Sequence, residues 1–302
     1  IANTFANRMM IRRKLGLEAG REDADNFFDA DLAEERVKTA FKDMGIATDG
    51  WQVYTGPSRY VRSGVYGIAV RPPNSIAIVM SNDRRWTLWQ YEAMAYGGGG
   101  AIWWQSIDDN AALSPPMWEP IPPWFEGFAS FFQRLTYEPG FHARYVPELP
   151  KELRSKLAAW RVNSMARSIA SSIVQTKVEQ RLYEDPNSLE AITRFAAETR
   201  QSLTGSAEAP VTESGLTYDS SLLSAILWTY PAYSQNYLFS AMTEAWMWEA
   251  IKASAGDPIG NPKVGEVIKR ELIQSGRSIP ESLAAMKPGH RIDAIKAYLN
   301  QK

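Results

Sequence analysis

A single carboxylate interrupts a long uncharged stretch of this chain. Glu92 is the only charged residue between Arg85 and Asp108. Residues 86–96 have the pattern of a helix, on which the neighbours of Glu92 at spacings of three and four are Leu88, Trp89, Ala95 and Tyr96. A carboxylate on such an apolar face needs a partner, or its pKa rises. Arg84, Arg85 or a tyrosine hydroxyl could serve, which makes a satisfied core group one interpretation of Glu92.

Glycine and proline divide the rest of the chain into expected elements. Helices are predicted over 1–20, from a cap at Asp29 or Asp31 to Met44, from Trp86 to Gly97, over 124–138, 149–184, 187–204 and 230–255, and in short pieces after Pro262. Short β-rich runs at 66–70 and 76–80 predict a hairpin or two edge strands. The fold class is therefore mainly α with one strand pair near 66–80.

Three turn-rich stretches and one glycine run complete this outline. Residues 46–65, 107–123 and 204–220 are predicted to be turns or loops. Gly97–Gly100 is interpreted as a helix stop, because neither a preceding strand nor a following Lys-Ser/Thr supports a phosphate cradle. We expect a single domain over 1–302, with a helical leading segment 1–60, a middle part 61–140 and a helical C-terminal part 141–302.

Composition excludes several classes of function. The chain has 302 residues, of which 45% are hydrophobic and 22% charged, as in globular proteins. With a net charge of −1 and well-mixed charges, no basic face favours nucleic acid. The absence of cysteine rules out disulfides and thiolate metal sites. No apolar run approaches the ~18 residues of a membrane span. Because the chain begins at Ile1, we expect a processed form or a fragment that lacks an N-terminal part.

The spacing around Glu92 matches a zinc-peptidase motif that has lost its histidines. Such enzymes place two histidines four residues apart on a helix, with a glutamate beside the first as general base, and a second helix supplies another carboxylate. Tyr91 and Ala95 stand at the two histidine positions, while Glu92 and Glu126 keep the carboxylates. Tyrosine is a poor zinc ligand at neutral pH, since its reference pKa is ~10, and alanine has no donor atom.

Further segments resemble one family of peptidases. The order of a β pair, the helix at 86–96, a proline-rich loop and the run from Glu126 to Phe132 resembles the gluzincin oligopeptidases, the clan of angiotensin-converting enzyme and thimet oligopeptidase. Residues 237–251 and 263–278 are similar to two segments of the angiotensin-converting enzyme branch. The resemblance spans roughly 30–300 and implies a helical fold with a central groove, of which this chain is the C-terminal catalytic half.

The resemblance also implies roles for individual residues. Glu92 stands at the general-base position and Glu126 at the third-ligand position. Tyr237 stands where a tyrosine steadies the tetrahedral oxyanion. Zinc is expected in the family, but the departures at Tyr91 and Ala95 remove its ligands, so we expect no cofactor. The resemblance further implies an exported or periplasmic bacterial location.

Other candidate sites carry less chemistry. His142 and His290 each follow a Pro-Gly step and are expected to be solvated surface histidines. The aromatic residues of the segment 230–248, Tyr233 and Tyr237 among them, fit either core packing or a groove wall that binds an extended peptide.

Three functional hypotheses follow. The first is a catalytically inactive metallopeptidase-like protein that binds a protein or peptide partner or serves as a structural subunit. The second is an active zinc-dependent oligopeptidase or peptidyl-dipeptidase with a non-standard metal site, for instance Glu92, Glu126 and a distant histidine. The third, compatible with the first, is a subunit whose companion chain supplies the N-terminal half.

Overall fold

The computed structural model describes residues 20–56, 65–71, 74–81, 87–105, 122–186, 189–204, 233–273 and 291–300. The helix expected over 1–20, almost all of the loops expected at 107–123 and 204–220, and His290 lie outside these ranges. The division into three parts and the central groove stay predictions.

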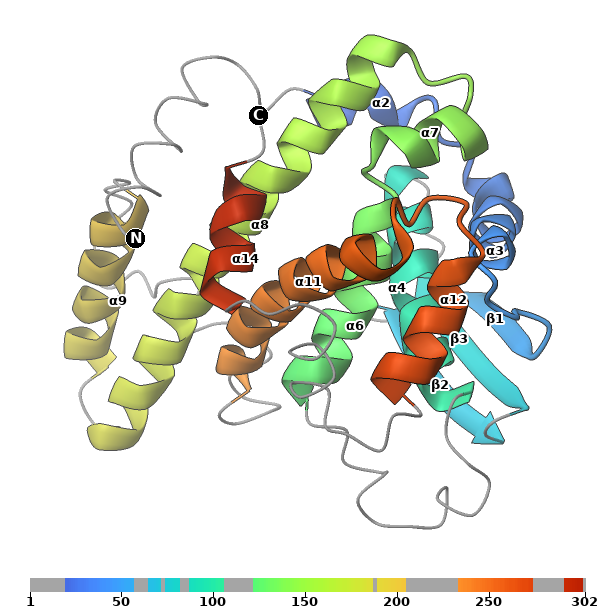
Figure 1. Cartoon of the computed structure of the whole chain (residues 1–302). Coiled ribbons are helices and arrows are strands. Elements are labelled where there is room, and N and C mark those ends of the chain that lie inside the picture. Colours follow the sequence, from blue (N-terminus) through green and yellow to red (C-terminus); the bar gives the residue numbers. More distant parts are fainter. Residues whose placement is uncertain are drawn as a thin grey trace.

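A small sheet packs against one end of the helical body (Figure 1). Its strands are β1 (Trp51–Gly56), β2 (Val65–Arg71) and β3 (Ser75–Ser81), in the order β1-β3-β2. β2 and β3 form the expected antiparallel hairpin, whereas β1 pairs with β3 in parallel. The prediction of turns throughout 46–65 was therefore wrong for β1. A six-residue strand between Gly50 and Gly56 leaves too short a run for periodicity to show.

Helices make up most of the remaining described structure, which confirms the mainly α class. They are α2 (Gly20–Asp25), η1 (Ala30–Leu32), α3 (Ala33–Asp43), α4 (Thr87–Gln105), α6 (Pro122–Leu135), α7 (Pro139–Tyr145), α8 (Lys151–Glu184), α9 (Leu189–Thr204), α11 (Ser234–Ala255), α12 (Lys263–Val267), the π-helical turn η2 (Ile268–Ile273) and α14 (Arg291–Leu299). The helix predicted over 124–138 is observed as α6, which begins at Pro122 and ends at Leu135, and α7 begins separately at Pro139. Within the described part of the chain, no helix is both long and apolar enough to cross a bilayer.

Helix α4 is the centre of the arrangement. It contacts β2 and β3 on one side and α6 on another, and α6 in turn packs against α11 (Figure 1). The long helix α8 packs against α11 and α2 and then extends beyond the body, where α9 pairs with it around a small separate cluster of Val174, Val178, Ile192 and Ala196.

The glycine run continues α4 instead of ending it, so the predicted helix stop was wrong. A Cβ on Gly98 would lie 2.9 Å from the Trp51 ring, and a Cβ on Gly99 would lie 2.8 Å from Cα of Ala129 on α6. The missing side chains let the sheet and α6 approach the α4 backbone closely. Contacts of this kind offset the roughly 1 kcal/mol by which each glycine disfavours a helix.

Candidate functional site

The residues of the degenerate zinc motif on α4 are buried. Tyr91 is 0% exposed, Glu92 6% and Ala95 1%. Since α4 is enclosed by the sheet, α3 and α6, none of the three faces open solvent. A carboxylate at such a position depends on partners from other segments.

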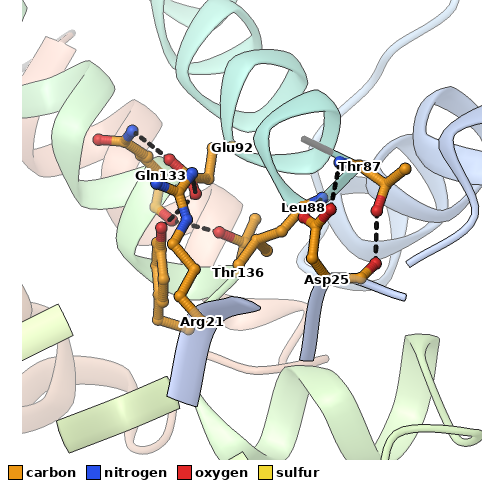
Figure 2. A network of polar contacts seen from close by, with 8 residues as sticks. Arg21, Asp25, Thr87, Leu88, Glu92, Gln133 and Thr136 are labelled. Atoms are coloured by element: carbon orange, nitrogen blue, oxygen red, sulfur yellow. Dashed lines mark hydrogen bonds and ion pairs between the residues drawn. The ribbon is translucent and has the colours of Figure 1, made fainter. Parts of the chain in front are cut away.

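Among the described residues, three side chains contact Glu92, and Figure 2 labels two of them, Arg21 and Gln133. Nη2 of Arg21, on α2, donates to Oε1 of Glu92 at 2.9 Å, and the Tyr137 hydroxyl donates to the same oxygen. Nε2 of Gln133, on α6, lies 3.4 Å from Oε2. Burial raises the pKa of Glu92, while the Arg21 charge and the Tyr137 hydrogen bond act in the opposite direction. The tyrosine partner is thus Tyr137, and Arg21 supplies a guanidinium. The other expected partners, Arg84 and Arg85, lie outside the described residues.

A second buried ion pair lies beside Glu92. Nη2 of Arg161, on α8, lies 2.8 Å from Oε2 of Glu244, on α11, and the Glu244 side chain is 1% exposed. The Arg161 guanidinium also lies 5.7 Å from the Tyr137 ring centroid and lowers the pKa of Glu92. Sequence reasoning missed this pair. Glu244 also lies in a largely apolar helix, but Glu249 and Lys252 follow it within α11, so the isolation that singled out Glu92 does not mark Glu244.

Tyr91 makes its own set of contacts toward α3. Its hydroxyl donates to the backbone oxygen of Asp29 at 3.0 Å, and Nη1 of Arg36 lies 3.4 Å from that hydroxyl. The ring packs edge-on against Phe28, with centroids 5.1 Å apart. Burial raises the pKa of Tyr91 to about 12, so the side chain is a neutral phenol at physiological pH.

Glu126 belongs to a different group of side chains. It lies two helical turns before Gln133 on α6, roughly 10 Å along the axis, and accepts hydrogen bonds from Tyr96 and Tyr233, the latter at 2.7 Å. The Tyr233 and Tyr237 rings pack with centroids 5.5 Å apart. Burial raises the pKa of Glu126. The structure therefore brings Glu126, Tyr233 and Tyr237 together, while Glu92 has other partners.

His142 is buried, which contradicts its prediction as a solvated surface residue. It is 0% exposed, and its Nε2 lies 2.7 Å from the backbone oxygen of Thr136. Burial lowers its pKa to about 4, so the imidazole is neutral at pH 7. The Pro-Gly step suggested a surface turn, but Pro139 instead begins α7, which places His142 on the inner face of that helix.

The side chains at these positions do not fit a zinc site. Tyr91 is a hydrogen-bonded neutral phenol, Ala95 has no donor atom, and Glu92 and Glu126 have separate sets of partners. Across the described ranges, no group of three or more histidine, cysteine, aspartate or glutamate side chains is arranged to hold a metal ion. A structural or catalytic zinc needs at least three such protein ligands.

The fold is shared with solved metallocarboxypeptidases, a class of metallopeptidase. The chain is similar to a protein described as BsuCP, with a TM-score of 0.67 and 11% sequence identity over 99% of this chain and 65% of that one. It is also similar to Trypanosoma cruzi metallocarboxypeptidase 1, with a TM-score of 0.65 and 11% identity over 99% and 67%. For an M32 carboxypeptidase from Deinococcus radiodurans R1 the TM-score is 0.64, with 9% identity over 98% and 65%.

The agreement with the sequence analysis is at the level of a metallopeptidase-like fold. The structures named above are carboxypeptidases, whereas the sequence resemblance pointed to the angiotensin-converting enzyme and thimet oligopeptidase clan. This chain spans about two thirds of their lengths. No protein-family profile and no curated protein matches the sequence.

Proposed function

We propose that this chain is a non-catalytic protein built on a metallocarboxypeptidase-like fold, and that it acts as a binding or structural subunit. The observation that carries the proposal is the state of Glu92. A general base needs a polarised water molecule within reach, and this carboxylate is 6% exposed and hydrogen-bonded to Arg21 and Tyr137.

The finer relationship to gluzincin peptidases is part of the same proposal. Tyr91, Glu92, Ala95 and Glu126 keep the spacing of the zinc motif, and the replacements at 91 and 95 remove the ligands together. Replacement of both histidines within a retained fold supports the loss of an ancestral active site. The partner, in this proposal, is a protein or a peptide.

The competing hypothesis is a working peptidase with an altered metal site. Within the described residues, His142 belongs to no group of three or more side chains that could hold a metal ion. A working site would therefore need ligands from outside the described residues, such as His290.

Metal content and hydrolysis separate the two hypotheses. Elemental mass spectrometry of the purified chain is expected to find no stoichiometric zinc, and blocked and free short peptides are expected to stay intact with and without a chelator. The matched control is Glu92→Gln, measured in parallel. Zinc near one equivalent, or chelator-sensitive cleavage that Glu92→Gln abolishes, would overturn the proposal.

A further inference from the structure

The Arg21 guanidinium lies between a carboxylate and an aromatic face. Nη2 is 2.9 Å from Oε1 of Glu92, and Cζ is 4.9 Å from the centroid of the Trp160 ring. Trp160 is held in place by stacking on Tyr137, with centroids 5.4 Å apart and an interplanar angle of 18°. Tyr137 in turn donates its hydroxyl hydrogen to Glu92. A fixed carboxylate beside an aromatic face is the chemistry that recognises a guanidinium group.

The Arg21 side chain can leave this position without displacing α2. Both carboxylate oxygens of Asp25 accept from the first backbone N–H groups of α4, at 3.0 Å from Thr87 N and 2.8 Å from Leu88 N (Figure 2). Ala24 is 0% exposed. These contacts anchor α2, while the Arg21 side chain is 23% exposed and reaches the surface. Rotation of one long side chain is therefore enough to open the position.

The surrounding charges favour one cation at this position. Arg161 forms its ion pair with Glu244 and Arg134 forms one with Glu138, so among the described residues Arg21 is the cation in direct contact with Glu92. With the Arg21 side chain rotated outward, the Arg161–Glu244 and Arg134–Glu138 pairs are each neutral, and the ionised Glu92 carboxylate is left with one uncompensated negative charge. A monovalent planar cation restores the balance.

We infer that Glu92, Tyr137 and Trp160 form a binding site for a guanidinium group, that Arg21 occupies it within the chain, and that an arginine side chain of a protein or peptide partner takes its place. This inference rests on the proposed non-catalytic role, because a carboxylate that served a metal-bound water could not also hold an arginine. Arg21 competes at the high effective concentration of a tethered ligand. The unmodified chain therefore binds a partner arginine weakly, and removal of the Arg21 side chain increases its affinity for a guanidinium group.

Calorimetric titration of ethylguanidinium into wild-type and Arg21→Ala protein tests the inference. The variant is expected to bind one equivalent at least ~100-fold more tightly than the wild type, as expected when a tethered competitor is removed. The same titration with n-propylammonium gives weaker binding, because an ammonium lacks the planar fork. A blocked Gly-Arg-Gly peptide is expected to show the same preference for the variant as ethylguanidinium, and a blocked Gly-Lys-Gly peptide is expected to bind as weakly as propylammonium. Equal affinity of wild type and variant, or no preference for guanidinium over ammonium, would refute the site.

Two further variants control the interpretation. Arg21→Ala combined with Glu92→Gln is expected to lose the binding, and retained binding there means that the ligand lies elsewhere. Should Arg21→Ala fail to fold, Arg21→Lys keeps the charge with a weaker occupant, and ethylguanidinium must then bind more tightly than to wild type. Zinc measured on the same wild-type samples distinguishes failure of the guanidinium site from failure of the proposed non-catalytic function. Zinc-free protein without guanidinium binding refutes the receptor alone, whereas stoichiometric zinc refutes the proposed function.

Discussion

Replacing Glu92 with glutamine separates the two roles that a buried carboxylate on α4 can play. In the structural role, Glu92 neutralises Arg21 and accepts hydrogen bonds from Tyr137 and Gln133. Glutamine has nearly the same shape, but it removes the negative charge and replaces one acceptor oxygen with a donor NH₂ group. In a catalytic role the carboxylate is kept for chemistry, and its replacement is neutral for stability or stabilising.

The contacts set the size of the effect. Breaking a buried ion pair by removing one partner costs about 3–5 kcal/mol, because the other charge is left without compensation. The Arg21 side chain is 23% exposed and can recover part of its hydration, so the cost lies at or just below the lower end of this range. We expect Glu92→Gln to lower the free energy of unfolding by about 2–3 kcal/mol. With an unfolding entropy of about 2.1 cal/mol/K per residue, the melting temperature falls by about 4 °C.

Urea denaturation followed by tryptophan fluorescence, with thermal melts as a second probe, measures this loss. The matched control is Glu184→Gln, which makes the same chemical change in the exposed Arg181–Glu184 pair and should cost less than about 0.5 kcal/mol. A Glu92→Gln variant as stable as wild type, or more stable, would refute the structural role of the carboxylate.

Three other expectations concern the same core. Gly99→Ala should lower the free energy of unfolding by about 1–2 kcal/mol, although alanine has the better helix propensity, because the α6 backbone is too close to the new methyl group. Gly100→Ala should be nearly neutral, since its methyl group would meet the edge of the Phe125 ring at 3.1 Å. Equal effects of the two substitutions in urea denaturation would contradict this. The neutral form of His142, with its pKa lowered to about 4, contributes stability above its unfolded pKa of ~6.5, and this contribution is lost as the pH falls toward 4. The difference in free energy of unfolding between wild type and His142→Gln should accordingly shrink by up to about 3 kcal/mol as the pH falls from 7 to 4. A difference that stays constant over this range would contradict the lowered pKa of His142. Glu244→Gln should lower the free energy of unfolding by about 3 kcal/mol, and Arg161→Met in the same chain should restore part of this loss. Additive losses of stability in this double-mutant cycle would argue against coupling between Arg161 and Glu244.

Most helices and two of the strands were predictable because their signals are local. The 3.6-residue periodicity and the terminating glycines and prolines identified α3, α8, α9 and α11 within a few residues, and the alternation around 66–80 identified the hairpin of β2 and β3. The strand β1 was not predictable in this way, because the described strand with which it pairs, β3, is separated from it in the sequence by β2. Pairing of this kind depends on tertiary contacts that a short window does not contain.

The glycine run also shows the difference between local sequence signals and tertiary packing. Locally, Gly97–Gly100 has the properties of a helix end, and only the approach of the sheet and of α6 makes glycine favourable inside α4. His142 likewise follows a Pro-Gly step that usually marks a surface turn, yet α7 carries it into the core. In the glycine run, packing outweighed a helix-propensity cost of about 1 kcal/mol per residue.

For the candidate site, the sequence by itself determined that Glu92 would lie on an apolar helix and would need a compensating group, because an isolated carboxylate is too costly to bury. It also determined that positions 91 and 95 could not supply imidazole ligands. Only the tertiary structure decided that Arg21 and Tyr137 provide the compensation, that Glu126 has other partners, and that the Arg161–Glu244 ion pair lies beside Glu92. The physical reason is that a charge requirement is a local property of the chain, whereas its satisfaction depends on which distant segments pack against it.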